Sequence, residues 1–151
     1  MKRGKISDTI LGRSVFKLLG KRGNTVKPAY GQDAAHINMQ GKPVLAAVST
    51  GELAVYRAVN NISAACGVAD CIMDTVIIDE KSREIRLKEI IKELDRQCCI
   101  AGVGIAGGHT TVSDKVNSPV VSVMAIGHQE RVQNKAVACL LYTSPSPRDC
   151  S

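Results

Sequence analysis

Residues 70–106 read DCIMDTVIIDEKSREIRLKEIIKELDRQCCIAGVGIA, and this stretch predicts a strand, a helix and a second strand. Asp70–Ile78 has the run of β-branched and apolar residues that is typical of a buried strand. Residues 83–100 carry an apolar stripe at helical spacing, made by Leu87, Ile90, Ile91, Leu94 and Cys98. Gly102 is expected to end this helix, and the next strand is predicted around Val103–Ala106.

The flanking segments extend this alternation. Pro43–Ser49 predicts a strand, and residues 52–66 predict a helix. One face of that helix is expected to hold Val55, Val59, Ile62 and Cys66. Pro119–Ile126 predicts a last strand, joined to the preceding one by the loop Ser113–Ser118. From residue 43 the order is strand, helix, strand, helix, strand, strand, which predicts an α/β (α+β) fold with a mixed, mostly antiparallel sheet and helices on one face.

Two shorter elements are predicted nearer the amino terminus. Residues 8–19 form a helical stripe that Asp8 would cap and Gly20 would end. The stripe consists of Leu11, Val15, Leu18 and Leu19. Gly31–Ile37 predicts a turn that enters a short strand.

The strand predicted at 119–126 is apolar on both faces. One face would hold Val121, Val123 and Ala125, and the other Val120, Met124 and Ile126. Two crossover helices cover only one face of the sheet, so the other would expose an apolar patch that soluble monomers avoid. The sequence therefore predicts a homodimer that packs through the sheet; the alternative is that the helix at 8–19 folds across this face.

Length, composition and cysteine spacing argue against several classes of protein. A chain of 151 residues suits one domain, and it has no apolar run of about 18 residues that could span a membrane. Its six cysteines include the adjacent Cys98 and Cys99 but no C-x-x-C pair, which argues against a disulfide framework and favours the cytoplasm. With 3% aromatic residues the chain lacks the stacking platforms that single-stranded nucleic acids need.

Most short motifs in the chain do not indicate chemistry. Gly102–Gly107 fits G-x-G-x-x-G, but it follows a predicted helix and does not open one, so it is no dinucleotide fingerprint. Two segments remain, Gly31–Ala35 and Gly107–Val112. The carboxylate of Asp33 could hold Mg²⁺ while phosphates supply other ligands, and paired glycines let a backbone approach a ligand closely.

Taken in order, several segments of the chain resemble a known family. They are GQDAA (31–35), VSTG (48–51), AVNNISAA (58–65), GGHTTV (107–112), NSPVVS (117–122) and IG (126–127). Over residues 8–130 they resemble the amino-terminal domain of the AIR synthase-related (PurM-like) superfamily. The Gly-Gly-His-Thr form is most similar to that of HypE-like hydrogenase maturation proteins.

The resemblance implies a function. It implies that the domain dimerises through its sheet, that ATP and Mg²⁺ bind near the dimer interface, and that a second, carboxyl-terminal domain completes the site. For HypE-like proteins it implies ATP-dependent dehydration of a carbamoylated cysteine on a hydrogenase maturation partner. It makes Asp33 a metal ligand, and it implies nucleotide contacts from Asp33, Thr50, Asn60, Asn61, Gly107, Gly108, His109 and Thr110. The catalytic residues are not given by the resemblance.

This chain departs from the family pattern at acidic positions. Gly51, Asn61 and His109 stand where the family usually has aspartate. Glu52 could supply the acid missing at position 51, but its side chain would point in a different direction. A hard divalent cation prefers charged oxygen ligands. One alternative is therefore a catalytically degenerate nucleotide- or metabolite-binding relative. A third possibility is a basic nucleic-acid-binding module, supported by the net charge of +6 and the cluster Lys21–Lys27.

The carboxyl-terminal stretch has a different character. Residues 139–149, CLLYTSPSPRD, resemble a translated sequencing adapter, so residues 139–151 are expected to be a non-native tail. Residues 1–130 would then be the ATP-binding domain and 131–138 the start of a truncated linker or second domain. The central expectation is that Asp33 and the glycine pair at 107–108 meet around a magnesium-bound triphosphate where two subunits join.

Overall fold

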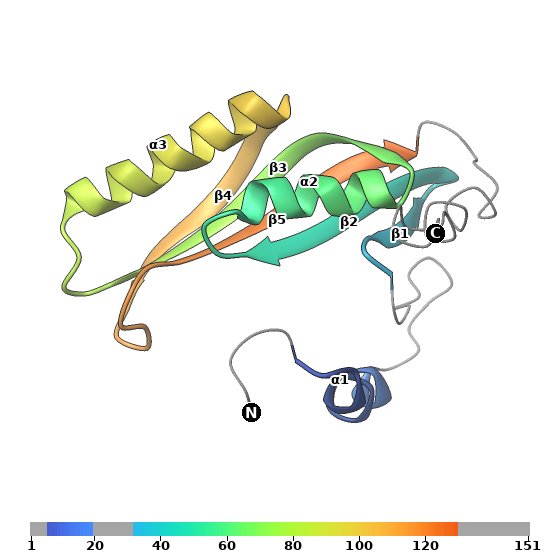
Figure 1. Ribbon diagram of the computed structural model, residues 1–151, viewed down its shortest axis with the longest axis horizontal. Helices are drawn as coiled ribbons and strands as arrows, with labels where there is room; N and C mark the ends of the chain where they lie inside the picture. The colour runs from blue at the N-terminus through green and yellow to red at the C-terminus, as the bar shows by residue number, and fades with distance from the viewer. Residues whose placement is uncertain (1–5, 20–31, 130–151) are drawn as a thin grey trace, which may run out of the picture.

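The computed structural model describes residues 6–19 and 32–129, which form a five-stranded sheet and three helices (Figure 1). The strands are β1 (Ala35–Met39), β2 (Lys42–Thr50), β3 (Gly67–Asp79), β4 (Gly104–Ser113) and β5 (Val120–Gln129). The helices are α1 (Asp8–Ser14), α2 (Ala54–Ala64) and α3 (Glu84–Ala101), with a 3₁₀ turn η1 at Phe16–Leu18. The predicted order of elements from residue 43 is confirmed.

The sheet has the order β1-β2-β5-β3-β4. Only β3 and β4 run parallel, and the crossover between them is α3; all other neighbours are antiparallel. The predicted mixed, mostly antiparallel α/β sheet is thus confirmed. β1 is a fifth strand in addition to the four expected after residue 43. In the observed order, β1 and β4 are the two edge strands.

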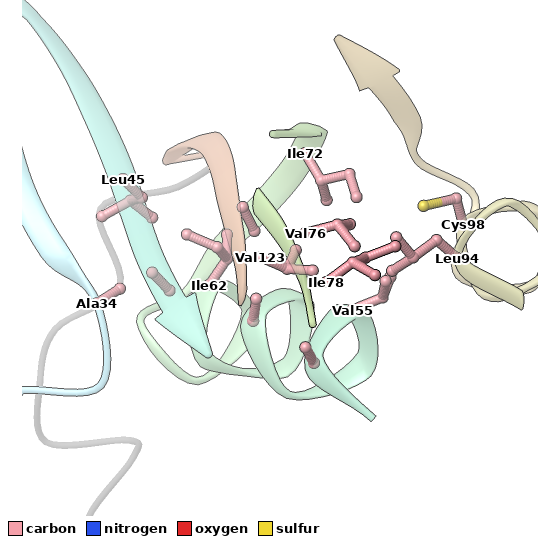
Figure 2. Packing of buried hydrophobic residues seen from close by; sticks show 14 residues of the cluster. Ala34, Leu45, Val55, Ile62, Ile72, Val76, Ile78, Leu94, Cys98 and Val123 are labelled. Carbon is pink, nitrogen blue, oxygen red and sulfur yellow. The ribbon is translucent and has the colours of Figure 1, made fainter. Parts of the chain in front are cut away.

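The core lies between one face of the sheet and the helices α2 and α3. Leu45, Ile72, Val76 and Val123 project from their strands onto this covered face, where each is fully buried (Figure 2). Ile62 of α2 packs into the same cluster. Alternate apolar residues of the strands pack in this layer against the apolar stripes of the helices, as predicted.

Helix α3 ends where the sequence predicts. Gly102 follows it in the left-handed conformation, with φ of 69°, and its N–H donates to the carbonyl of Cys99. A left-handed residue after the last turn is the usual helix stop that glycine allows. Gly102 therefore belongs to a helix end, and the dinucleotide interpretation of Gly102–Gly107 is excluded by the strand that follows.

Three local predictions are wrong. The strand predicted around Val103–Ala106 continues to Ser113, because its parallel ladder with β3 persists through the glycine pair. The helix predicted over 8–19 ends at Ser14, and its N-cap is Ser7, not Asp8; Gly20 lies outside the described residues. Cys66 is not on a helical face but in the turn after α2, with φ of 60°.

Helix α1 does not cover the free face of the sheet. It buries none of its residues, and Figure 1 shows it set apart from the sheet. Its main packing partner is η1. In the described part of the chain, this helix therefore does not shield the apolar face, contrary to the alternative prediction. None of the helices in the described ranges has the length and apolar character that crossing a membrane requires.

Candidate functional site

No described helix covers the second face of the sheet, here called the uncovered face. Register places Val48, Met124 and Met73 side by side across three strands of this face. Val48 is 62% exposed and Met73 41% exposed. Val120 and Ile77 form a second apolar pair four residues further along the strands. An apolar surface of this kind usually marks an interaction site.

A line of polar residues crosses the uncovered face between these apolar rows. It consists of Thr50, Ser122, Thr75 and His109, here called the polar row, which register places opposite one another on β2, β5, β3 and β4. Residues directly opposite on neighbouring strands have Cβ atoms about 5 Å apart. The hydroxyl of Ser122 donates to the carbonyl of Ser49 at 3.5 Å. The other three side chains make no hydrogen bond within the described part of the chain, so they are available to a ligand.

A bulge sets which residues of β4 reach the uncovered face. Ile72 pairs with Ile105 but Met73 pairs with Gly107, so Ala106 is an extra residue in β4. One extra residue exchanges the two faces of the strand beyond it. The bulge therefore turns His109 toward the uncovered face, next to Thr75.

The predicted glycine motif is divided between the two faces of β4. Gly107 lies opposite Met73 beside the polar row, and a Cβ placed on it would meet no atom within 4 Å. Gly108 and Thr110 alternate to the covered face. A Cβ on Gly108 would collide with the carboxyl group of Asp74. Gly107 thus leaves open space for a ligand, while Gly108 makes room for the carboxyl group of Asp74 on the covered face.

The carboxyl group of Asp74 belongs to the covered face. Its pKa is raised above the ordinary value because of burial, only partly offset by a backbone hydrogen bond. Burial also raises the pKa of the Cys98 thiol on α3, with smaller contributions from Asp95 and Asp74. Asp74 is therefore a neighbour of α3 and does not face the polar row.

Replacing Asp74 by asparagine is expected to stabilise the protein at pH 7, raising Tm by a few degrees. A raised pKa in the folded state means that folding penalises the carboxylate, so stability falls as pH rises above the ordinary value of 3.8. The neutral amide avoids this penalty. Thermal melting of both proteins from pH 3 to pH 7 should show an advantage of Asp74→Asn that grows with pH; a variant that melts lower at pH 7 would contradict it.

Asp33 and the glycine pair do not meet within one chain. Asp33 is exposed just before β1, at one edge of the sheet, and Gly107 lies in β4 at the other edge. Four strand spacings separate the two edges, which is about 19 Å. They can therefore meet only where two subunits join, as predicted, and that meeting stays a prediction.

The predicted asparagines also lie away from the polar row. Asn60 and Asn61 belong to α2, which packs on the covered face. Asn60 is exposed and Asn61 half-buried. Of the predicted side chains, only Thr50 and His109 belong to the polar row. Thr75 and Ser122 were not predicted as site residues, although each is a polar residue in the middle of an otherwise apolar strand.

The loop after Thr50 is held from the covered side. The Gly51 N–H donates to the Val121 carbonyl at 3.0 Å, and the Glu52 carbonyl accepts from the side-chain amide of Gln97 at 2.8 Å. Gln97 is buried and also donates to Glu93. Hydrogen bonds from Arg96, which has the larger effect, and from Gln97 lower the pKa of the Glu93 carboxyl group to about 2. Gln97, which no motif singles out, fixes the backbone just beyond Thr50.

Glu52 does not replace the acid missing at position 51. It lines a cavity of about 530 Å³ on the covered side. The other walls are formed by residues of α3 and by the segments 51–53 and 119–121, among them Arg86, Glu89, Leu94 and Pro119. The polar row lies on the opposite side of the sheet.

The donor set of the uncovered face does not fit a divalent cation. Within residues 6–19 and 32–129 no three His, Cys, Asp or Glu side chains are grouped so that they could hold a metal ion. The carboxylates nearest in sequence to the polar row, Glu52 and Asp74, lie on the covered side. Hydroxyls and one imidazole are poor substitutes for the charged oxygens that Mg²⁺ prefers.

The fold agrees with comparisons to known proteins. The profile of the family described as AIR synthase related protein, N-terminal domain, matches residues 26–129. The chain belongs to this family. No curated protein matches the AIR synthase-related chain.

Solved structures share the AIR synthase-related fold. HypE in a HypE–HypF complex is 24% identical with a TM-score of 0.58, over 66% of this chain and 37% of HypE. HypE in complex with ATP is 22% identical with a TM-score of 0.54, over 64% and 33%. AaThiL complexed with AMPPCP and TMP is 17% identical with a TM-score of 0.58, over 70% and 38%. The chain thus spans less than two fifths of the length of these proteins.

Proposed function

We propose that this chain is the ATP-binding amino-terminal domain of an AIR synthase-related protein, and that the nucleotide phosphates bind beside the polar row. The observation that carries the proposal is the row itself: three hydroxyls and an imidazole on an open sheet face, next to the bare backbone of Gly107. Two proteins of the same fold are described with ATP or AMPPCP bound, which supports a nucleotide as the ligand.

The proposed unit is a homodimer that packs through the uncovered face. Its support is the exposed apolar surface of Val48, Met73 and Val120. In such a dimer, a second copy could supply Asp33 to the site, which one chain does not do. Asp33 as a Mg²⁺ ligand stays a prediction that depends on this arrangement, and the cytoplasm stays the predicted location.

The proposed role of the whole protein is HypE-like: ATP-dependent maturation of a hydrogenase through dehydration of a carbamoylated cysteine. It is supported by the likeness to HypE, and a HypE–HypF complex makes a maturation protein a reasonable partner. This activity would need the part of the longer HypE chains that this chain does not cover. The alternative is a catalytically degenerate nucleotide-binding relative, favoured by Gly51, Asn61 and His109 at positions where the family usually has acids.

Equilibrium titration of the 151-residue chain with ATP tests the proposal. Thr75→Val removes one uncommitted hydroxyl of the polar row and is expected to weaken binding about fivefold, the equivalent of one hydrogen bond. Thr110→Val is the matched control, because Thr110 is a threonine of β4 that register places on the covered face. Equal affinities of both variants and the unmodified chain would place the nucleotide elsewhere.

ATP hydrolysis by a longer homologue with the same residues separates the two roles. Tight binding without turnover supports the degenerate relative, whereas turnover stimulated by a carbamoylated partner supports the HypE-like enzyme.

A further inference from the structure

We infer that the polar row binds the phosphate groups of the nucleotide directly, so that affinity does not depend on a divalent cation. This inference rests on the proposed function and specifies how the same site recognises its ligand. Two observations support it. The side chains that the sheet brings together on the uncovered face are hydrogen-bond donors, and the nearby carboxylates lie on the covered face.

The groups on the uncovered face are hydrogen-bond donors to a phosphate. The hydroxyls of Thr50 and Thr75 and the ring of His109 have no partner within the described part of the chain, and each can donate to a phosphate oxygen. An aspartate at position 109 would repel a phosphate unless a cation lay between them. Histidine removes that repulsion and adds a donor, so the exchange changes how the site recognises phosphate.

The edge strand adds a second kind of donor. β4 is the last strand of the described sheet, so the backbone groups along its outer edge pair with no described strand. At Gly107 no side chain screens them, and the space where a Cβ would stand is open. A phosphate can therefore approach the main chain there as well as the ring of His109 two residues further on.

The carboxylates that could recruit a cation do not face this place. A Cβ on Gly108 would meet the carboxyl group of Asp74, which therefore lies on the covered face. Glu52 lines the cavity beside α3. Asp79 is four residues from Thr75, about 13 Å along β3, and its oxygens accept from Ser82 and from the Lys81 N–H. Even if a partner subunit contributes Asp33, one carboxylate falls short of the charged set that Mg²⁺ prefers.

Titration of the 151-residue chain with ATP, once in excess EDTA and once in excess Mg²⁺, tests the inference. The unmodified chain is expected to bind ATP with dissociation constants that agree within about twofold, a difference below 0.5 kcal/mol. His109→Asp is expected to lose about tenfold or more in EDTA and to recover when Mg²⁺ is added, because the new carboxylate needs a cation to accept a phosphate. His109→Asn is the matched control, because asparagine has the size of aspartate but no charge. Its affinity for ATP should fall by the same factor in both buffers.

Each outcome has a distinct meaning. Binding by the unmodified chain in Mg²⁺ but not in EDTA would overturn this inference and leave the proposed function standing. Absence of binding in both buffers would overturn the proposed function itself. Thermal melting of each variant verifies folding, and if His109→Asp does not fold, a loss of affinity in His109→Asn confined to the Mg²⁺ buffer would still overturn the inference.

Discussion

Replacing Met73 by glutamate is expected to convert the proposed sheet-mediated dimer to a monomer. Met73 lies in the middle of the uncovered face, between Met124 and Gly107, and is 41% exposed in the single chain. A face-to-face dimer would bury one unpaired carboxylate from each subunit, and each burial costs several kcal/mol. The dimer dissociation constant should rise by about 100-fold or more. Sedimentation equilibrium over a range of protein concentrations measures this change.

A charge placed elsewhere on the molecule should leave the dimer intact. Ile100 is a suitable control, because this residue of α3 is 63% exposed and belongs to the opposite side of the sheet. Ile100→Glu is expected to sediment as the unmodified protein does. An unmodified protein that stays monomeric at all concentrations, or a Met73→Glu variant that still dimerises, would refute the sheet-mediated dimer.

Replacing Ile72 by alanine is expected to lower the free energy of unfolding by about 2–5 kcal/mol. Ile72 is adjacent to Met73, but it points to the covered face and is fully buried among the core residues. Removing three carbons there leaves a cavity that the rigid sheet cannot close. Because small domains are stable by only about 5–15 kcal/mol, this loss is a large part of the total. Urea unfolding followed by circular dichroism measures it.

The matched control for this truncation is Ile85→Ala. Ile85 lies in the first turn of α3 and is 60% exposed, so the same truncation should change stability by less than about 1 kcal/mol. Similar losses in the two variants would show that the covered face is not the core.

Periodicity alone was enough to predict the main architecture. The stripe from Leu87 to Cys98 predicts α3, and the run Asp70–Ile78 predicts most of β3, because such patterns follow directly from which side of an element is buried. The length of β4 was missed because glycines such as Gly107 have low strand propensity. Its ladder with β3 continues through them, and this pairing is a tertiary effect that local sequence does not encode.

The site was harder to predict than the fold. Spacing along β4 does not show that Ala106 is an extra residue, yet this bulge decides that His109 lies on the uncovered face. The sheet order puts Asp33 and Gly107 at opposite edges of one subunit, which their order along the chain does not reveal. Both features depend on pairing between strands, and a single sequence specifies this pairing only weakly when the strands are apolar on both faces.

A crystal structure of the 151-residue chain grown with ATP would reveal the dimer and the nucleotide site together. We expect two copies packed through their uncovered faces, with a phosphate group within hydrogen-bond distance of His109 and the hydroxyl of Thr75. A nucleotide bound instead in the cavity between α3 and residues 119–121, with the uncovered face left in solvent, would contradict it.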